Sequence, residues 1–433
     1  MPKMELDPHK IYKMPKKVFV RKIDDCYLAI SSETANWVLL QNDQQLQIYQ
    51  MLADGKSVLE AINTIDKNMQ PDLYHVLVEL EAKRFECVKV NYPQDQGMYI
   101  YLTNRCNQRC RHCYMYAGKE MDHELTTEEL QKILHGFALG GGKVVTFTGG
   151  EATLRKDFKT IVTSAKREGL MVGVLSNGTM WPAEWKQWVK EAIDEVQVSI
   201  DGFDKDSYQC VRGMDSFQTA LDTVDWLVSA GVRVTVSITP LLETLISNES
   251  KYIEFADYLL EKYRDKPFFV KFNTELMDGR MINPTEAENE RYRKSIKQIE
   301  VACKPYSEEQ GFAMDHIHNT VFNNCGYGGL TIASNGDIYF CNLIECCAKQ
   351  GNVRDMSFDD IMFISQKARE LSDINNLIPC NNCDLKYICG GGCRVKNFKR
   401  LVELQIDKET SKESFTREKV CTQDYKERMY RLM

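Results

Sequence analysis

Cysteine is the residue whose distribution most constrains how this chain can fold. The sequence has 433 residues and 16 cysteines, most of which fall into two groups. Cys106, Cys110 and Cys113 lie within eight residues, and nine more lie between Cys325 and Cys421. Grouped thiols in a chain that is not exported predict metal centres, because cytosolic thiols are kept reduced. The other four are isolated and are expected to be buried apolar side chains: Cys26, Cys87, Cys210 and Cys303.

The overall composition narrows the functional classes. Apolar residues make up 43% and charged residues 27%, and the length allows about three domains at roughly 150 residues each. The net charge of −7 argues against a basic surface for nucleic acid. The charged N-terminus has no apolar stretch behind it, and no apolar run reaches the ~18 residues of a membrane span. We therefore expect a cytoplasmic protein with no nucleic acid and no membrane as partner.

Residues 1–92 are predicted to form a small separate module. Two short β-rich runs, 18–20 and 27–30, come first, and helical patterning follows over 37–52. A C-cap glycine and the spacing of a capping box then mark the boundary between two helices. The residues that carry these boundary signals are Gly55, Ser57 and Glu60.

Residues 93–280 have a different sequence pattern. Short β-branched or aromatic runs alternate with amphipathic segments of helical length, such as 127–139 and 158–168. This alternation implies right-handed βαβ units and a parallel sheet. Six units are too few for a closed eight-stranded barrel, so we predict an α/β fold with a partial (β/α)6 barrel. The six predicted strands are 99–103, 144–148, 172–175, 196–200, 232–238 and 268–272.

Polar residues and glycines follow several of these predicted strands. In α/β barrels the carboxyl ends of the strands build the active site, so these residues are expected to converge at one mouth. Ordinary turns are the alternative, because Gly and Asn favour turns. The first cysteine group follows the first strand, which favours a shared site. The residues after strands two to four are Gly149, Gly150, Glu151, Ser176, Asn177 and Asp201.

The rest of the chain divides into two parts. Residues 281–324 are charged and predicted to be a helical connector. In residues 325–433 glycine and cysteine become frequent and long periodic helices become scarce. That pattern is typical of a fold held by metal rather than by a large core.

The first cysteine group has the spacing C-x3-C-x2-C. Three thiolates can hold three irons of a cubic 4Fe–4S cluster and leave the fourth iron open to a small chelating molecule. The alternative is a zinc site with three protein ligands and a water. The nearby imidazole, His112, is adjacent to Cys113, which makes joint ligation of one ion awkward.

This spacing after a first strand, followed by Gly149-Gly150-Glu151 and a six-unit partial barrel, closely resembles the radical S-adenosylmethionine (SAM) enzymes. The resemblance implies that the open iron binds SAM through its amino and carboxylate groups. One electron from the cluster then splits SAM, and a deoxyadenosyl radical removes a substrate hydrogen. In such enzymes the cofactors carry the chemistry and the protein orients them. An electron donor such as flavodoxin or ferredoxin is then expected.

The resemblance also assigns roles to single residues. Cys106, Cys110 and Cys113 would ligate the cluster. The glycines of the Gly149–Glu151 motif would let the backbone approach SAM, and the carboxylate would suit the SAM ammonium. His112 stands where the family usually has a larger aromatic residue, and its ring can stack on adenine with weaker apolar contact.

Further SAM contacts are implied at the next strands. Ser176 and Asn177 correspond to polar residues near the ribose and methionine moiety, and Ser199 and Asp201 end the fourth strand in the same region. Arg212 matches an arginine near the SAM carboxylate, and the alternative for Arg212 is a surface salt bridge.

The second cysteine group has two arms. They are Cys325-x10-Gly336-x4-Cys341 and Cys380-x2-Cys383-x5-Cys389-x3-Cys393, with Cys421 after 27 more residues. This order resembles the SPASM domain, an extension of radical SAM enzymes that carries two auxiliary iron–sulfur clusters. With the first cluster, three 4Fe–4S clusters are expected. A structural zinc ribbon is the alternative, since paired CxxC motifs often bind zinc.

The resemblance implies two ligand sets. One cluster is fully ligated by Cys380, Cys383, Cys389 and Cys421, and the other takes Cys325, Cys341 and Cys393. The fourth ligand of the second set is undecided in the sequence. Cys346 or Cys347 can supply it, or the iron is open and can bind a substrate thiolate.

The N-terminal module resembles the peptide-recognition (PqqD-like) element of enzymes that mature ribosomally made peptides. The resemblance implies that a leader peptide adds to its sheet as an extra strand. We expect the edge to be the run 27–30, beside the helix near Leu46. A generic helical cap and a DNA-binding winged helix are the alternatives, and the acidic charge argues against DNA.

Together these resemblances predict a radical SAM/SPASM maturase that cross-links a precursor peptide bound through its leader. A Cys thioether bond is the first expectation and a carbon–carbon bond the second. A sulfatase-type formylglycine maturase is another alternative, but such enzymes place an acid beside the cysteine that corresponds to Cys341, where this chain has Asn342. A zinc-bearing, non-catalytic peptide scaffold is the last.

Overall fold

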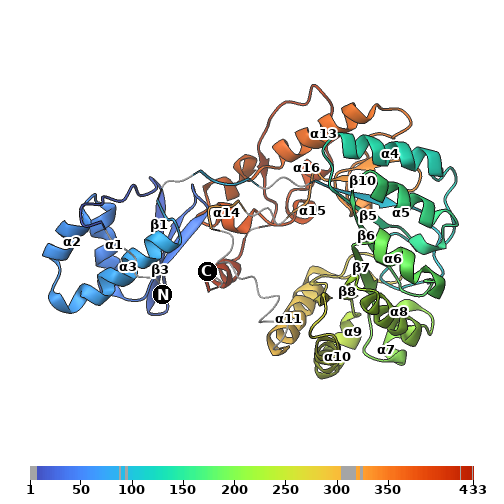
Figure 1. The fold of residues 1–433 in the computed structure, drawn as a ribbon, viewed down its shortest axis with the longest axis horizontal. Coiled ribbons are helices and arrows are strands. Elements are labelled where there is room, and N and C mark those ends of the chain that lie inside the picture. Colours follow the sequence, from blue (N-terminus) through green and yellow to red (C-terminus); the bar gives the residue numbers. More distant parts are fainter. Residues whose placement is uncertain are drawn as a thin grey trace.

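The fold is that of a computed structural model, which describes residues 7–86, 89–92, 96–303, 318–321, 325–419, 421–431 and 433. Figure 1 shows three parts that follow one another along the chain. They are an N-terminal module, a curved α/β layer and a cysteine-rich C-terminal part.

The N-terminal module is a three-stranded antiparallel sheet followed by three helices. The sheet has the order β1-β2-β3, with β1 (Val18–Ile23), β2 (Cys26–Ser31) and β3 (Asn36–Leu40). The helices are α1 (Asp43–Ala53), α2 (Val58–Thr64) and α3 (Gln70–Ala82). The predicted boundary signals are present: Gly55 follows α1 with a φ of +91°, and Ser57 and Glu60 form a capping box on α2.

Two predictions for this module are wrong. Residues 37–40 belong to strand β3 rather than to a helix, because their side chains alternate between two cores. Val38 packs with the helices of the module, whereas Trp37 packs against the C-terminal part. The run 27–30 is not a sheet edge, because β2 pairs with β1 on one side and with β3 on the other. The outer strands are β1 and β3.

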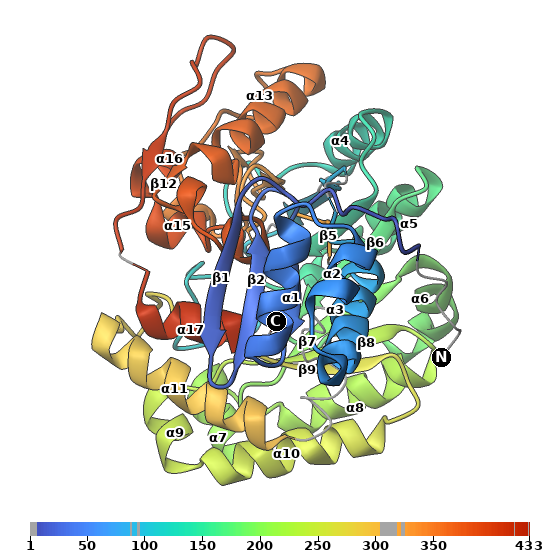
Figure 2. The ribbon, with the colours of Figure 1, turned by 90° about the vertical axis from the view of Figure 1, so that its left-hand side faces the viewer.

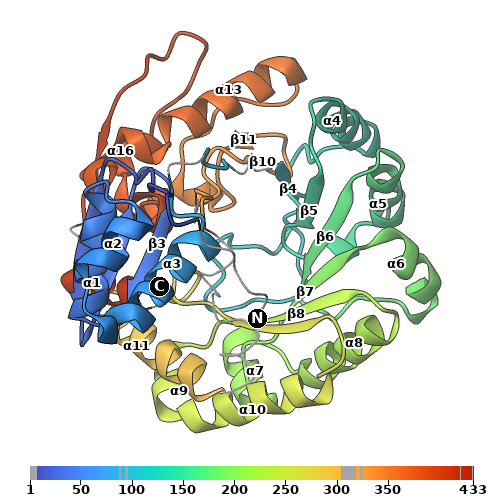
Figure 3. The same cartoon turned by 60° about the vertical axis from the view of Figure 1, so that its left-hand side comes forward.

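Six parallel strands confirm the predicted partial barrel. They pair in chain order, and helices lie on the outer side of the curved sheet (Figure 3). The strands are β4 (Gly97–Tyr101), β5 (Val144–Thr148), β6 (Met171–Ser176), β7 (Glu195–Ser199), β8 (Arg233–Ile238) and β9 (Phe268–Phe272). The helices are α4 (Thr127–Leu139), α5 (Phe158–Arg167), α6 (Lys186–Ala192), α7 (Lys205–Arg212), α8 (Phe217–Ser229), α9 (Leu242–Ser247) and α10 (Glu249–Lys262).

The cysteine-rich part extends this sheet beyond the six predicted strands. β10 (Leu330–Ile332) pairs in parallel with β4, and β11 (Ile338–Tyr339) pairs antiparallel with β10. Among the described strands, β9 and β11 are the two ends of the sheet. The C-terminal part is therefore built onto the barrel beside β4, the strand that leads into the first cysteine group.

The remaining elements are mostly short. α11 (Glu286–Ala302) lies in the predicted connector, and α13 (Phe358–Leu371) is longer than the sequence predicts for a metal-held part. The others are η5 (Ile344–Cys346), β12 (Leu377–Ile378), η7 (Cys380–Asn382), α14 (Lys386–Cys389), α15 (Arg394–Asn397), α16 (Lys399–Val402), β13 (Phe415–Thr416) and α17 (Gln423–Arg431).

The N-terminal sheet packs directly on the cysteine-rich part, as Figures 1 and 2 show for β1, α14 and α17. Trp37 Nε1 donates a hydrogen bond of 3.0 Å to the backbone oxygen of Met433. Arg21 Nε lies 2.7 Å from the buried carboxylate of Asp384, the residue after Cys383. An apolar cluster joins the two parts: Leu28, Ile30, Trp37, Leu385, Ile388 and Tyr430.

The isolated cysteines differ in their surroundings. Cys303 is buried as expected, Cys26 is partly buried, and Cys87 lies outside the described residues. Cys210 is exposed on α7, contrary to the prediction, where its sulfur accepts a hydrogen bond of 3.6 Å from Arg111. Within the ranges that the structure describes, no helix combines the length and apolarity that crossing a bilayer requires.

Candidate active site

A cavity of about 500 Å³ lies at the carboxyl ends of the barrel strands. The structure brings most of the predicted site residues together there. The cavity is lined by all three cysteines of the first group and by residues at, or just after, the carboxyl ends of β5, β6 and β7. The predicted residues among its lining are Cys106, Cys110, His112, Cys113, Gly149, Gly150, Ser176, Asn177, Ser199 and Arg212.

The two glycines fit against the loop that carries Cys106. A Cβ atom on Gly149 would lie 2.3 Å from the backbone oxygen of Thr103, and one on Gly150 would lie 2.4 Å from that of Arg105. Gly149 also has a φ of +138°, a region that side chains rarely adopt. The backbone of Gly150 donates to Thr103 at 2.7 Å. Only glycine therefore lets the two loops meet at this distance.

Glu151 lies beneath the cavity, with 1% of its surface exposed. Its carboxylate accepts hydrogen bonds from the Thr153 hydroxyl (2.6 Å) and amide (3.2 Å), the Ser176 hydroxyl (2.9 Å) and the Asn177 amide (2.7 Å). Burial raises the pKa of Glu151, although these hydrogen bonds oppose the shift. The carboxylate thus ties the end of β5 to the end of β6, and its contact with the SAM ammonium stays a prediction.

Asp201 is fully buried and connects two residues of the cavity wall. His112 Nε2 lies 2.7 Å and Arg212 Nε 2.6 Å from Asp201 Oδ2, and the Thr239 amide donates to Oδ1 at 2.7 Å. Burial alone would raise the pKa of Asp201, but the Arg212 and His112 charges outweigh it and lower the pKa. The carboxylate therefore positions both side chains.

Arg212 is buried, so the surface salt bridge considered for it is wrong. Besides its ion pair with Asp201, its Nη1 donates to Gln108 Oε1 at 3.4 Å and to Cys110 Sγ at 3.7 Å. Burial raises the pKa of the Cys110 thiol, and the Arg212 charge opposes that shift. Arg212 thus holds a positive charge beside a predicted cluster ligand.

The three thiols of this cavity fit an iron–sulfur cluster. Burial raises the pKa of Cys106 to about 11, so a free thiolate there is disfavoured until a metal deprotonates it. In the described part of the chain, no group of three or more Cys, His, Asp or Glu side chains converges on a point that would hold one ion. The open space between the cysteines and the Gly149–Gly150 turn leaves room for a small molecule beside such a cluster.

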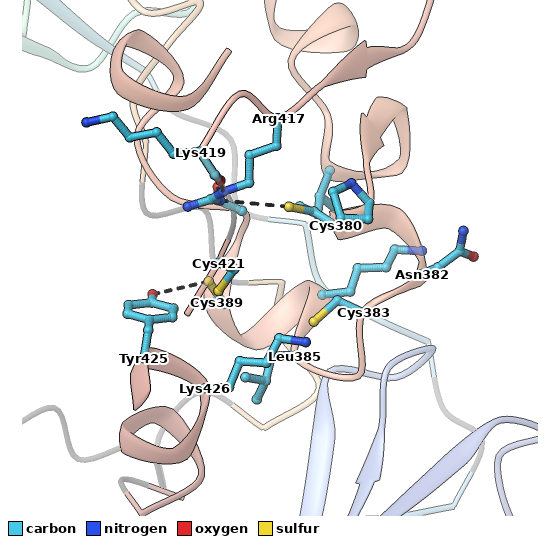
Figure 4. Close-up of a pocket in the computed structure, with 14 residues that line it drawn as sticks. Cys380, Asn382, Cys383, Leu385, Cys389, Arg417, Lys419, Cys421, Tyr425 and Lys426 are labelled. Atoms are coloured by element: carbon cyan, nitrogen blue, oxygen red, sulfur yellow. Dashed lines mark hydrogen bonds between the residues drawn. The ribbon is translucent and has the colours of Figure 1, made fainter. Parts of the chain in front are cut away.

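A second cavity, of about 430 Å³, is lined by Cys380, Cys383, Cys389 and Cys421 (Figure 4). Four cysteines around one space can hold a cubic 4Fe–4S cluster with one thiolate on each iron. Tyr425 and Arg417 add polar contacts: the Tyr425 hydroxyl lies 3.2 Å from Cys389 Sγ, and Arg417 Nη1 donates to Cys380 Sγ at 3.9 Å. The surroundings fit a multi-iron cluster with four cysteine ligands.

The other predicted set is Cys325, Cys341 and Cys393. The thiols of Cys325 and Cys393 are within hydrogen-bonding reach of each other. The loop after Cys341 reaches the first cavity, where Asn342 and Leu343 line the wall. The backbone oxygen of Asn342 accepts a hydrogen bond of 2.6 Å from Tyr101 on β4.

Several cavity residues were not found by sequence reasoning. Lys396 lies on α15, the short helix that follows the predicted ligand Cys393. It lines the cavity and forms an ion pair with Glu275 of the barrel. Gln108 and Tyr114 also line it. Gln108 and Tyr114 lie within or beside the first cysteine spacing, which is a signal that could have found them. Nothing local marks Lys396 and Glu275, because their pairing depends on how two domains meet.

Two family profiles match these regions. The radical SAM superfamily matches residues 100–256, and the SPASM iron-sulfur cluster-binding domain matches residues 324–384. The chain therefore contains a radical SAM domain followed by a SPASM domain, as its motifs predict. The curved parallel sheet is the partial barrel of the first domain, and the cysteine-rich part holds the second.

Individual relatives share mainly these domains. The sporulation killing factor maturation protein SkfB of Bacillus subtilis (strain 168) is 32% identical over 182 residues, which are 42% of this chain and 43% of SkfB. A GTP 3',8-cyclase of Actinobacillus pleuropneumoniae is 30% identical over 42% of this chain and 54% of its own length. An AdoMet-dependent heme synthase of Oleidesulfovibrio alaskensis is 24% identical over 69% of this chain and 82% of the synthase. The chain thus spans about half the length of the first two relatives.

Solved structures show the same fold. SuiB of Streptococcus suis aligns with a TM-score of 0.51 and 16% identity over 95% of this chain and all of SuiB (100%). The anSMEcpe protein with bound AdoMet aligns with a TM-score of 0.55 and 16% identity over 78% of this chain and 95% of that protein. At these identities the likeness is one of fold.

Proposed function

We propose that this protein is a radical SAM maturase that oxidatively cross-links a ribosomally made precursor peptide. The observation that carries the proposal is that one cavity is lined both by the first cysteine group and by the loop that follows Cys341. The radical would then form, and an electron acceptor would lie, at the same cavity. Net two-electron oxidation of a substrate needs both the radical and the acceptor. One electron leaves the substrate with the abstracted hydrogen atom, and the second leaves after the new bond forms.

When bound, the first cluster and SAM supply a deoxyadenosyl radical to this chamber. The protein's own residues bind and orient these groups. Gly149 and Gly150 open the backbone side of the cavity, Asn177 offers polar contacts, and Arg212 carries a charge that suits a carboxylate. Lys396 and Glu275 close the side that faces the SPASM domain. An external electron donor such as flavodoxin or ferredoxin would supply the reducing electron.

The N-terminal module would hold the leader peptide in this proposal. Its sheet has two outer strands, β1 and β3, and an extended peptide can add to an outer strand through backbone hydrogen bonds. The similarity to SkfB, a sporulation killing factor maturation protein, supports a maturation activity. The alignment with SuiB also extends over more of this chain than that with anSMEcpe.

The first expected product is a thioether between a cysteine sulfur and a carbon of the same peptide, and a carbon–carbon bond is the second. Formylglycine formation is disfavoured because the residue after Cys341 is Asn342, and an amide cannot accept a proton as a carboxylate can. A zinc scaffold is disfavoured because, among the described residues, no three or more Cys, His, Asp or Glu side chains converge on a point that would hold one ion.

The test is anaerobic co-expression with short candidate precursor peptides, followed by intact mass measurement. We expect the loss of two hydrogens from one peptide. Blocked thiol alkylation in that product would identify a thioether, and alkylation that still proceeds would identify a carbon–carbon bond. A precursor without its leader should stay unmodified. An unchanged mass for every candidate, or a cysteine converted to formylglycine, would contradict the proposal.

A further inference from the structure

The SPASM domain contains two adjacent cysteines, Cys346 and Cys347, whose thiols have different neighbours. We propose that Cys347 is the fourth ligand of the auxiliary cluster held by Cys325, Cys341 and Cys393, and that Cys346 is not a ligand. This cluster would then have no iron open to a substrate thiolate. The proposal rests on the SPASM domain and not on the peptide that the protein modifies.

Sulfur positions are the first argument. The Cys341 and Cys347 thiols are within hydrogen-bonding reach of each other, as are those of Cys325 and Cys393. Cys347 also lies within electrostatic range of Cys393, and Cys341 within that of Cys325, so the two pairs are neighbours. The phenol of Tyr327 is within electrostatic range of Cys325, Cys341 and Cys347 and so borders the same group.

Cys346 has different neighbours. It has no thiol within hydrogen-bonding reach among its described interactions. The described groups within electrostatic range of Cys346 are Tyr114, Asp278, Cys341, Glu345 and Cys347. Of the two adjacent cysteines, Cys347 is therefore the one that lies within hydrogen-bonding reach of another predicted ligand.

The backbone explains why neighbours diverge. The 3-10 turn η5 ends at Cys346, and Cys347 leaves it in extended conformation with φ −130° and ψ 152°. The backbone amide of the next residue, Ala348, donates a hydrogen bond of 2.9 Å to the backbone oxygen of Val402 on α16. This bond holds the chain after Cys347 against the rest of the domain. Cys347, like Cys325 and Cys341, packs against the main apolar core. The turn thus fixes which of the two thiols reaches the cluster.

Backbone donors complete the environment of this group. The Arg394 amide donates to Cys325 Sγ at 3.3 Å, and the Leu343 amide donates to Cys341 Sγ at 3.5 Å. Amide hydrogen bonds to sulfur stabilise cluster thiolates and tune their potential. On binding iron, each of the four thiols would release one proton and form one Fe–S bond. A cluster closed in this way can take up an electron from the substrate but cannot hold the substrate sulfur.

The adjacent cysteines provide a matched pair of variants. Both changes are made in the full chain with Cys106, Cys110 and Cys113 replaced by Ala, so that only the auxiliary clusters remain. Proteins are reconstituted anaerobically and compared by iron content and by electron paramagnetic resonance of the reduced state, before and after addition of 2-mercaptoethanol. We expect about eight irons per chain in the parent, and no change of its spectrum with the thiol.

Cys347→Ala should lose about one iron or more from one cluster, or give a new signal that responds to 2-mercaptoethanol. Cys346→Ala should match the parent, and Cys347→Ser, whose oxygen can still ligate, should keep more iron than Cys347→Ala. The proposal is overturned if Cys346→Ala has the larger effect, if the two alanine variants behave alike, or if the parent already responds to the thiol. Because the background cannot cleave SAM, none of these results depends on the proposed function.

Discussion

At the scale of single residues, Glu151 joins the ends of β5 and β6 at the cavity of the barrel mouth. It accepts four hydrogen bonds from three residues and pairs with no cation among the described ones. Those donors include the hydroxyl of Ser176 and the amide of Asn177, both residues that line the cavity. The predicted ligand contacts at the end of β6 therefore depend on a carboxylate that does not itself line the cavity.

Glu151→Gln should weaken the site through this network. The amide nitrogen brings a donor to a place where every neighbour donates, and an unpaired buried polar group costs about 1–3 kcal/mol. We expect a lower midpoint of thermal unfolding and weaker SAM binding, measured anaerobically by calorimetry with the reconstituted protein. Glu261→Gln, an exposed exchange on α10, is the control and should change neither. Unchanged SAM affinity in Glu151→Gln would show that the network does not position the ligand contacts.

Gly150→Ala tests the close approach of the two loops. The added methyl group would meet the Arg105 carbonyl oxygen at 2.4 Å, so the loop that carries Cys106 must shift. We expect loss of the first cluster, seen as about four fewer irons per chain, with the auxiliary clusters retained. Gly140→Ala is the matched control, because the nearest atom to its new Cβ is 3.4 Å away. Equal iron content in the two variants would contradict this role for Gly150.

At the scale of elements, the two faces of the N-terminal sheet pack against different parts of the molecule. Ala29, Val38 and Leu40 face the helices of the module, whereas Leu28 and Trp37 face the SPASM domain next to Cys383 and Cys389. A peptide added to an outer strand would therefore lie on a sheet whose other contacts surround a predicted cluster. This sheet therefore packs directly against the segment that carries Cys383 and Cys389.

Trp37→Ala should loosen that link. Trp37 is 1% exposed, and truncating a buried Trp typically costs about 3–5 kcal/mol. We expect faster proteolytic release of the module and a lower midpoint of thermal unfolding. Leu39→Ala on the same strand is the control, since Leu39 is 36% exposed and should tolerate the change. Similar proteolysis of the two variants would mean that the module is held elsewhere.

Strand β3, which carries Trp37, could not be predicted from the sequence, whereas the six barrel strands could. The six barrel strands were predicted because β-branched or aromatic runs alternate with segments of helical length, a pattern carried by neighbouring stretches of chain. Strand β3 was missed because its apolar residues also fit a helix, and what decides is the packing of Trp37 on a domain more than 300 residues away. β10 was missed for the same reason, since only its pairing with β4 makes it part of the barrel sheet. The choice between Cys346 and Cys347 likewise depends on a three-dimensional turn.

At the scale of the whole molecule, the cavity is completed by contacts between domains. Lys396 of the cysteine-rich C-terminal part and Glu275 of the barrel form an ion pair at its wall, and Arg293 of α11 lies 3.5 Å from the same glutamate. The Asn342 loop adds a second contact through Tyr101. In the proposed function, these contacts would close the cavity wall around a bound peptide core.

Lys396→Met should therefore uncouple SAM cleavage from peptide modification. We expect deoxyadenosine to form at a rate near that of the wild type, while product per deoxyadenosine falls at least several-fold. Both are measured by chromatography and mass spectrometry on one reaction. Lys399→Met changes an exposed lysine three residues away and should keep the ratio. A parallel fall of deoxyadenosine and product would instead indicate damage to the SAM site.

The central claim is that Cys106, Cys110 and Cys113 hold a cluster with one iron left for SAM. The most direct test is anaerobic reduction of reconstituted protein with dithionite in the presence of SAM, followed by quantification of 5'-deoxyadenosine. The account predicts deoxyadenosine from the wild type and none above background from the variant with all three cysteines replaced by Ala. No deoxyadenosine from wild type that carries its full iron content, or an undiminished amount from the triple variant, would contradict it.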